Sequence, residues 1–137
     1  MPSESALVIL GLAAWYVFIL LMLAGLRLYH TLVLGKAANS FRPDGRDLPG
    51  FGERLSRVHA NCFENIPLHM AVLLYAVATG QTGVTDGGAT TLLCARMAQS
   101  LVHAASTSVP AVYLRFVLFA LQNGIVVWWI WQMATAR

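Results

Sequence analysis

The sequence predicts an all-α integral membrane protein, folded as a four-helix bundle. Hydrophobic residues make up 58% of the chain and charged residues 11%, whereas an ordinary soluble domain has about 25% charged residues. Apolar stretches long enough to cross roughly 30 Å of hydrocarbon recur along the chain, and polar turn regions separate them. A length of 137 residues indicates one domain, and a net charge of +3 without a long basic block argues against nucleic-acid binding.

The first predicted span covers residues 6–29. No charged residue occurs between Glu4 and Arg27, so the uncharged stretch has the length of about 20 residues that a membrane-spanning helix needs. The polar segment from His30 to Gly52 contains Gly, Pro and Asp residues, which favour turns and break helices. We therefore expect a long loop after the first span.

Three further spans are predicted from the rest of the chain. The second, over residues 52–79, is polar in its first three turns and apolar in the remainder. The segment GQTGVTDGG, residues 80–88, predicts a turn before a third span at residues 89–107. Pro110 marks the next connection, and the fourth span is predicted over residues 111–134.

The basic residues predict the orientation of these spans. The first loop and the start of the second span contain Lys36, Arg42, Arg46, Arg54 and Arg57. The loop between the second and third spans contains no Lys or Arg. Because cytoplasmic loops carry an excess of these residues, we expect both termini on the non-cytoplasmic side. Trp128, Trp129 and Trp131 fit an aromatic belt at the far interface, and lipid-facing packing explains them equally well.

A polar stripe opens the second predicted helix. Arg57, Asn61 and Glu64 stand at positions i, i+4 and i+7, so they share one face. Ionisable side chains at the mouth of a span are costly to bury, and they normally face the protein interior and mark a polar ligand path. The stripe is therefore the first candidate for a binding site.

The third predicted helix carries a second polar face. Arg96, Gln99 and His103 stand at i, i+3 and i+7. Arg96 lies near mid-span, where an unpaired arginine costs at least about 2.5–3.5 kcal/mol. Glu64 is the only acidic residue that the sequence places within its reach. One interpretation is therefore a purely structural Arg96–Glu64 ion pair between two helices.

The balance of charge favours a bound anion instead. The predicted cluster contains four cations near the single carboxylate of Glu64, namely Arg27, Arg57, Arg96 and Arg115. Arginine suits bidentate binding of carboxylates. A tripeptide with carboxylates at both ends and a thiol in the middle would satisfy such a cluster. A phospholipid head group would satisfy it too, so both ligands stay open on charge alone.

The segment RVHANCFENIP, residues 57–67, resembles the signature of the MAPEG family, the membrane-associated proteins in eicosanoid and glutathione metabolism. Four predicted spans, with a long first loop and a short third one, are similar to the family's layout. The resemblance implies a homotrimer of four-helix bundles. It also implies that glutathione binds between neighbouring subunits on the cytoplasmic side.

The resemblance further implies roles for individual residues. Arg57, Asn61 and Glu64 match the family's glutathione-binding arginine, asparagine and glutamate. Arg27 is similar to an arginine at the end of the first span that reaches the tripeptide. Arg96 resembles the arginine of the third span.

The catalytic positions match the family less closely. Arg115 resembles the fourth-span arginine that stabilises the thiolate. Relatives often carry a tyrosine or histidine three residues after the third-span arginine and a tyrosine four residues later, where this chain has Gln99 and His103. Another register aligns His103 with the family histidine but replaces the arginine by Ser100. We prefer the first register because it retains the arginine and puts Pro110 at the expected connection, so Gln99 becomes a candidate glutathione ligand.

These observations predict a membrane-bound glutathione-dependent transferase or peroxidase that acts on lipophilic electrophiles. Arg115 would favour the thiolate, and His103 would hydrogen-bond the sulfur or assist proton transfer. The histidines lack metal-ligand spacing, so no metal is predicted. Glutathione is the expected cofactor, and the expected partners are a lipophilic substrate, membrane lipids and two further copies of the chain.

Two other functions remain as alternatives. A non-catalytic lipid-binding or scaffold protein of the same fold is favoured by the missing third-span tyrosine. A small transporter subunit is less well supported, because no broken helix or inverted repeat is visible. The small size and the absence of a retention tail favour a bacterial inner membrane as the location.

Overall fold

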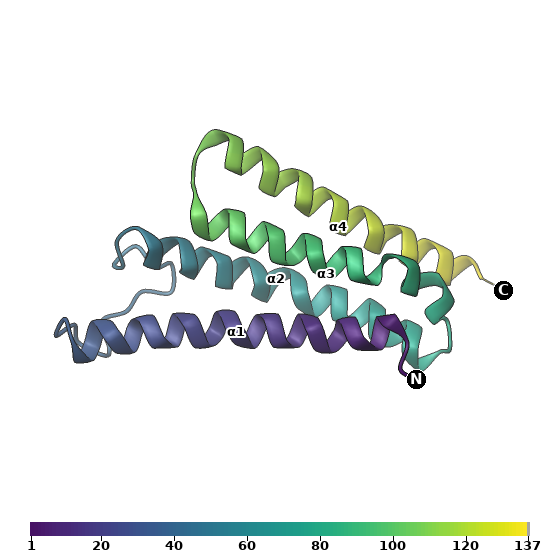
Figure 1. Ribbon diagram of the computed structural model, residues 1–137, viewed down its shortest axis with the longest axis horizontal. Helices are drawn as coiled ribbons and strands as arrows, with labels where there is room; N and C mark the ends of the chain where they lie inside the picture. The colour runs from purple at the N-terminus through teal and green to yellow at the C-terminus, as the bar shows by residue number, and fades with distance from the viewer. Residues whose placement is uncertain (137) are drawn as a thin grey trace.

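The computed structural model describes residues 1–136, which form four α-helices and no β-strand. The helices are α1 (Glu4–Leu32), α2 (Phe51–Ala78), α3 (Thr82–Ala105) and α4 (Val109–Thr135). Successive helices run antiparallel. The long α1–α2 loop and the α3–α4 connection therefore lie at one end of the bundle, and the N-terminus and the end of α4 lie at the other (Figure 1). The predicted all-α four-helix fold is confirmed.

The core lies between α1, α2 and α3, which all contact one another. Leu12, Leu73 and Leu92, one from each helix, are fully shielded from solvent. On α1, the buried residues are three, four or seven positions apart, which is the spacing that one helical face requires. The outward surfaces of the helices expose many large apolar side chains, as a bundle surrounded by lipid requires.

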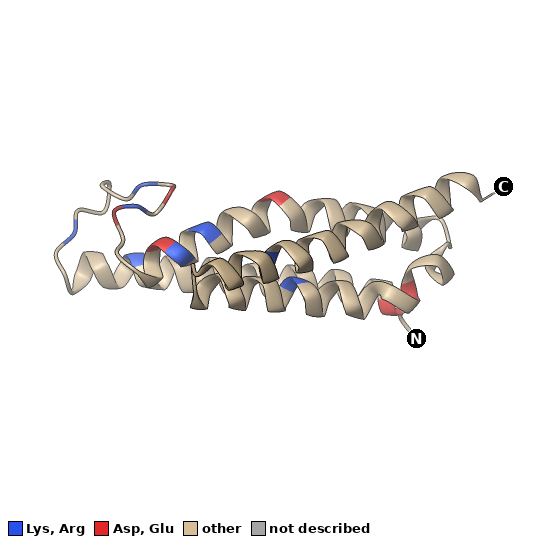
Figure 2. Cartoon of the chain, turned by 90° about the horizontal axis from the view of Figure 1, so that it is seen from above, with Lys and Arg blue, Asp and Glu red and all other residues tan. Residues whose placement is uncertain are grey.

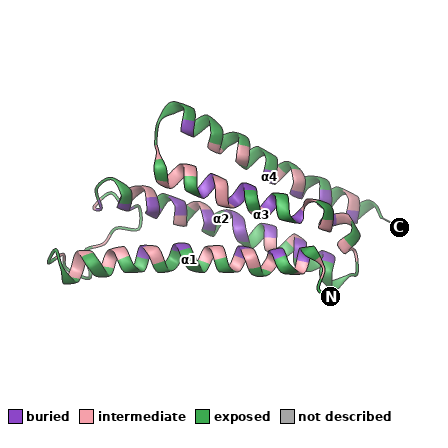
Figure 3. Ribbon diagram, in the orientation of Figure 1, coloured by how far each residue is buried: buried purple, intermediate pink, exposed green. Residues whose placement is uncertain are grey.

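Helix α4 packs mainly against α3 and diverges from it toward the α3–α4 connection (Figure 1). Between Ala111 and Gln122 no residue of α4 is fully buried (Figure 3). Gln122 holds the two helices together, because its Nε2 donates to Gln99 Oε1 at 2.9 Å. The first half of α4 therefore stands apart from the core, with Arg115 on it.

Two helices, α1 and α4, are long and apolar enough to cross a membrane. Helices α2 and α3 have 28 and 24 residues, so their lengths would also suffice. Their polar faces lower their apolar content, and the expectation that they span the membrane stays a prediction.

The third helix begins earlier than the sequence predicts. The expected turn over residues 80–88 is wrong, because α3 starts at Thr82 and not near Ala89. Only residues 79–81 separate α2 from α3. The other helix ends lie within a few residues of their predicted positions.

Contacts with α1 and α4 explain the longer third helix. Asp86 Oδ1 accepts hydrogen bonds from the Ser5 backbone nitrogen at 2.9 Å and from Ser5 Oγ at 2.6 Å. Gly88 lies against Trp129, and a Cβ atom at this glycine would stand only 3.0 Å from the indole ring. Packing between helices therefore outweighs the low helix propensity of glycine in this segment.

We expect Asp86→Ala to lower the midpoint of thermal unfolding in detergent. The variant loses two hydrogen bonds at the N-terminus of α1, where a carboxylate also interacts favourably with the helix dipole. Bonds to a charged group contribute about 1.5–3 kcal/mol. Circular dichroism melts would measure the change. Asp44→Ala, which removes an exposed loop carboxylate, should leave the midpoint unchanged, and equal midpoints for wild type and Asp86→Ala would contradict the prediction.

The α1–α2 loop, residues 33–50, folds back onto the end of α1. Phe41 lies under two cations, with Arg27 Cζ 5.6 Å and Lys36 Nζ 5.3 Å from the ring centroid. Within the loop, a hydrogen bond from Arg42 holds the pKa of the Asp44 carboxyl below its usual range. These contacts place the loop beside Arg27.

Candidate functional site

Charged residues are distributed unevenly along the bundle. Lys and Arg are concentrated toward the end that holds the α1–α2 loop (Figure 2). At the opposite end, the charged residues of the described chain are Glu4 and Asp86 (Figure 2). The predicted orientation requires this asymmetry, although the side of the membrane on which each end lies stays a prediction.

The polar stripe lies on one face of α2, as its spacing predicts. Arg57 and Glu64 are exposed and Asn61 is half-buried. Arg57 Nη2 donates to Glu53 Oε1 at 2.7 Å, while Glu64 forms no ion pair within the part of the chain that the structure describes. A cavity of about 340 Å³ adjoins the start of the stripe, and it is lined by Gly50, Glu53, Arg54, Arg57 and Thr107.

Arg96 is completely buried between α2 and α3, with an exposed fraction of 0%. Its Nη1 donates to Asn61 Oδ1 at 2.7 Å, whereas its Nε and Nη2 have no hydrogen-bond partner in residues 1–136. The purely structural Arg96–Glu64 ion pair, one of the two interpretations of the sequence, does not form within residues 1–136. Glu64 points to the exposed side of α2, and the amide of Asn61, one turn earlier, meets the guanidinium instead.

Other buried polar groups surround Arg96 and join three helices. Ser100 Oγ donates to the Arg96 carbonyl at 3.0 Å, accepts from Trp15 Nε1 at 3.2 Å, and lies 3.5 Å from Cys62 Sγ. His69 is 1% exposed, and neither of its ring nitrogens has a partner among the described residues. Sequence analysis did not identify this network, although the i+4 spacing of Ser100 from Arg96 was a usable signal.

His103 and Arg115 extend the site toward α4. The guanidinium groups of Arg115 and Arg57 both lie within electrostatic range of His103. Arg115 is half-buried, and its Nε is buried without a hydrogen-bond partner within residues 1–136. Side chains from α2, α3 and α4 therefore converge at the end of the bundle where α4 diverges.

Gln99 is buried and engaged in helix pairing. Its Oε1 accepts from Gln122 Nε2, and Gln122 Nε2 also donates to the Leu118 carbonyl at 2.8 Å. The bond connects α3 to α4 in the middle of the bundle. A role for Gln99 as a glutathione ligand stays a prediction.

Arg27 lies beside the α1–α2 loop and does not line the cavity that adjoins Arg57. It lines a cavity of about 540 Å³ between α1, the loop and α2, together with Leu20, Leu23, Ala24, Phe41, Pro43, His59, Ala60 and Phe63. His59 stands two residues after Arg57, so the two side chains leave α2 in different directions. None of the three stripe residues lines this cavity, although Ala60, which neighbours Arg57 and Glu64 on α2, does. The Nε of Arg27 is buried and has no hydrogen-bond partner in the described part of the chain.

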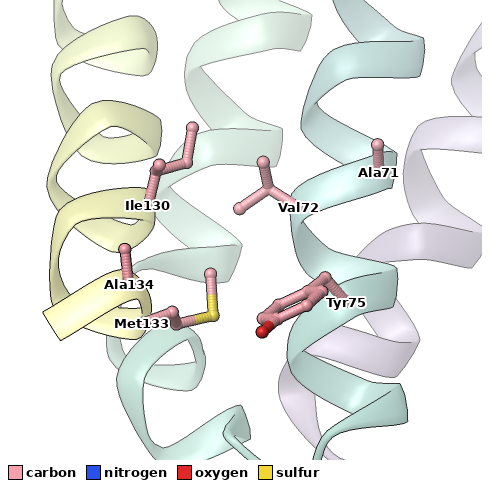
Figure 4. A pocket seen from close by; sticks show the side chains of 6 residues that line it. All are labelled: Ala71, Val72, Tyr75, Ile130, Met133 and Ala134. Carbon is pink, nitrogen blue, oxygen red and sulfur yellow. The ribbon is translucent and has the colours of Figure 1, made fainter. Parts of the chain in front are cut away.

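A separate apolar cavity lies between α2 and α4, beside the last turns of both helices (Figure 4). Its volume is about 310 Å³, and it is lined by Ala71, Val72, Tyr75, Ile130, Met133 and Ala134 (Figure 4). None of the predicted site residues contributes to it. The polar site and this cavity are therefore distinct.

Comparison of the chain with curated proteins and with solved structures gave no match. The family model of the MAPEG family matches residues 5–135, which include nearly all of the four helices. Together with the two apolar helices, this match indicates a membrane protein. Because the matched segment covers almost the whole sequence, the chain belongs to the MAPEG family.

Proposed function

We propose that this MAPEG protein is a membrane-bound glutathione-dependent transferase or peroxidase that acts on lipophilic electrophiles. The observation that carries the proposal is a set of incompletely bonded arginines. Arg27 and Arg115 each keep a buried Nε without a hydrogen-bond partner in residues 1–136. Guanidinium groups only donate, so a ligand rich in acceptor oxygens is the chemistry that suits them.

Glutathione fits this donor set. Its two carboxylates and its peptide carbonyls are acceptors, and arginine binds carboxylates in bidentate geometry. Its amino group needs an anionic partner, and Glu64 is exposed and free of ion pairs among the described residues. Arg57, Asn61 and Glu64 would therefore hold the tripeptide along the stripe.

We infer that the site is completed between subunits of a homotrimer. The cavity that Arg27 lines shares no residue with the cavity beside Arg57, which supports a site that needs two copies. A cyclic assembly that packs the Arg27 surface of one subunit against the stripe of the next would join them. We place the loop end of the bundle in the cytoplasm of a bacterial cell and the termini on the other side of its inner membrane.

Arg115 and His103 are the proposed catalytic residues. A free thiol has a pKa of about 8.5 and is mostly protonated at neutral pH. A nearby guanidinium favours the thiolate, which is the nucleophile for conjugation or peroxide reduction. His103, within electrostatic range of Arg57 and Arg115, is the candidate to hydrogen-bond the sulfur or to accept its proton. The lipophilic electrophile would enter from the bilayer.

A non-catalytic lipid-binding or scaffold role is the second candidate. One observation favours it: Gln99, at a position where relatives often carry a tyrosine or histidine, is bonded to Gln122. The same arginines would bind an anionic head group. An activity assay distinguishes the two roles: wild-type protein in detergent is given glutathione with a lipophilic aryl halide or an organic hydroperoxide, and turnover is measured. Saturable turnover supports the enzyme, and bound glutathione that neither ionises nor reacts supports the scaffold.

Co-assembly of two variants tests the site between subunits. Arg57→Ala and Arg27→Ala are each expected to bind glutathione up to about 100-fold more weakly when assembled alone. Trimers formed from an equal mixture should regain about a quarter of the sites, because an intact Arg57 meets a neighbour's intact Arg27 with that frequency. Calorimetric titration would count the sites.

The matched control is an equal mixture of Arg57→Ala and Glu64→Ala. Both changes lie on the same stripe, so no pair of neighbours restores an intact site and no binding should return. Recovery in this control, or no recovery in the test mixture, would contradict the assignment of Arg27 to a neighbouring subunit.

A further inference from the structure

We propose that Arg96 is a positioning residue that fixes the orientation of the Asn61 amide, so that Asn61 offers the ligand a hydrogen-bond donor. The inference rests on the proposed function, because it specifies one contact of the same glutathione site. In this inference Arg96 does not contact the ligand but orients Asn61, which does.

Only one orientation of the Asn61 amide is compatible with its hydrogen bond to Arg96. An asparagine amide offers an acceptor oxygen on one side and a donor NH₂ on the other, and nearby groups decide which way it turns. Arg96 Nη1 lies 2.7 Å from Asn61 Oδ1. Because a guanidinium never accepts a hydrogen bond, the opposite orientation would set two donors against each other. Arg96 therefore holds Oδ1 toward the core.

This orientation decides what Asn61 presents to the ligand. Asn61 is half-buried, and within residues 1–136 its side-chain amide makes no other hydrogen bond. Its Nδ2 is therefore available on the stripe that Arg57 and Glu64 share. The ligand atom that meets Nδ2 must be an acceptor, which in glutathione is a peptide carbonyl or a carboxylate oxygen.

Burial of Arg96 makes the positioning rigid but adds little stability. The side chain is fully buried, yet its Nε and Nη2 lack partners in the described chain. A buried charge with incomplete compensation is costly, and replacing it by an apolar residue of similar size is often neutral or stabilising. Costly local arrangements of this kind are expected at functional sites.

A double-mutant cycle tests the inference directly. Glutathione affinity would be measured by calorimetry for Arg96→Gln, for Asn61→Ala and for the combination. Glutamine can donate or accept, so Arg96→Gln frees the Asn61 amide to turn, and we expect affinity to fall about 10-fold, as for the loss of one hydrogen bond. In the Asn61→Ala background the same change should have an effect of less than about twofold, because residues that act as a unit are not additive.

Two further variants keep the inference testable if Arg96→Gln folds poorly. Asn61→Asp retains an acceptor for Arg96 but presents no donor to the ligand, so its affinity should fall at least about 10-fold although the shape is unchanged. Arg96→Lys, which is also a donor only, should bind glutathione more tightly than Arg96→Gln. Wild-type affinity in Asn61→Asp would overturn the inference.

Thermal unfolding separates positioning from a structural role. We expect Arg96→Met to melt at or above the wild-type midpoint and yet to bind glutathione about 10-fold more weakly, since it cannot orient Asn61. Equal losses for Arg96→Gln in the wild-type and Asn61→Ala backgrounds would overturn the inference. If wild-type protein bound no glutathione at all, the proposed function itself would fail, which is a distinct result.

Discussion

Arg57→Ala is expected to weaken glutathione binding by up to about 100-fold. Arg57 is exposed on the stripe of α2, and its Nη2 already lies 2.7 Å from Glu53 Oε1. A hydrogen bond to a charged group contributes about 1.5–3 kcal/mol, and each 1.4 kcal/mol corresponds to a tenfold change in affinity. Removal of the guanidinium also leaves the ligand carboxylate without its partner in a partly dehydrated site. Calorimetric titration in detergent would measure the loss.

Arg46→Ala is the matched control for this prediction. Arg46 has a 71% exposed side chain in the α1–α2 loop, at the same end of the bundle, and it pairs with Asp44 at 3.6 Å. The control removes the same charge without touching the stripe, so its effect on affinity should be small and should vanish at high salt. Equal losses in the two variants would mean that the arginines attract glutathione only through the general field and do not form a specific site.

The helices and the stripe could be predicted because they depend on local spacing. Arg57, Asn61 and Glu64 share a face in any α-helix that contains them, and long apolar stretches favour helices in a membrane protein. Three polar residues at the entrance of an apolar helix were enough to predict a candidate site. The family match over residues 5–135 supports the signature that these residues form.

The partner of Arg96 could not be predicted, because it depends on how α2 and α3 are rotated against each other. Glu64 was the only acidic residue that the predicted spans placed within reach of Arg96. Rotation of α2 turns Glu64 outward and Asn61 toward the guanidinium. A buried arginine that bonds a neutral amide is a costly arrangement, and costly arrangements at functional sites are where local sequence rules fail.

Two other features depended on contacts between distant parts of the chain. Helix α3 extends to Thr82 because Ser5 and Trp129, from the two ends of the sequence, pack against its first turns. The spacing of residues along the helices also did not predict the cavity that Arg27 lines, because the folded loop and α2 form its other walls. Helix propensity and periodicity carry no information on either contact.

Arg115→Ala is expected to raise the apparent pKa of enzyme-bound glutathione thiol by about two units, toward the value of about 8.5 for a free thiol. A shift of two units corresponds to about 2.7 kcal/mol of preferential binding to the thiolate. Arg115 can supply this energy because it is half-buried and its Nε is buried without a partner in residues 1–136. Low dielectric strengthens the attraction between guanidinium and thiolate. The ultraviolet absorbance of the thiolate, followed against pH, would measure the apparent pKa.

The pH dependence of the reaction rate distinguishes a catalytic role of Arg115 from a binding role. The thiol bound to the wild-type protein ionises at lower pH than the thiol bound to Arg115→Ala. The difference in reaction rate between the two proteins should therefore be greatest near neutral pH. It should disappear above the pKa of the free thiol, where both proteins hold thiolate. Arg115→Lys keeps the charge but not the planar fork, so its pKa should lie between the two. Arg46→Lys is the control, because Arg46 lies in the α1–α2 loop with a 71% exposed side chain, outside the site. If Arg115→Ala weakened glutathione binding and left the thiol pKa unchanged, Arg115 would be a binding residue and the thiolate would need another cation.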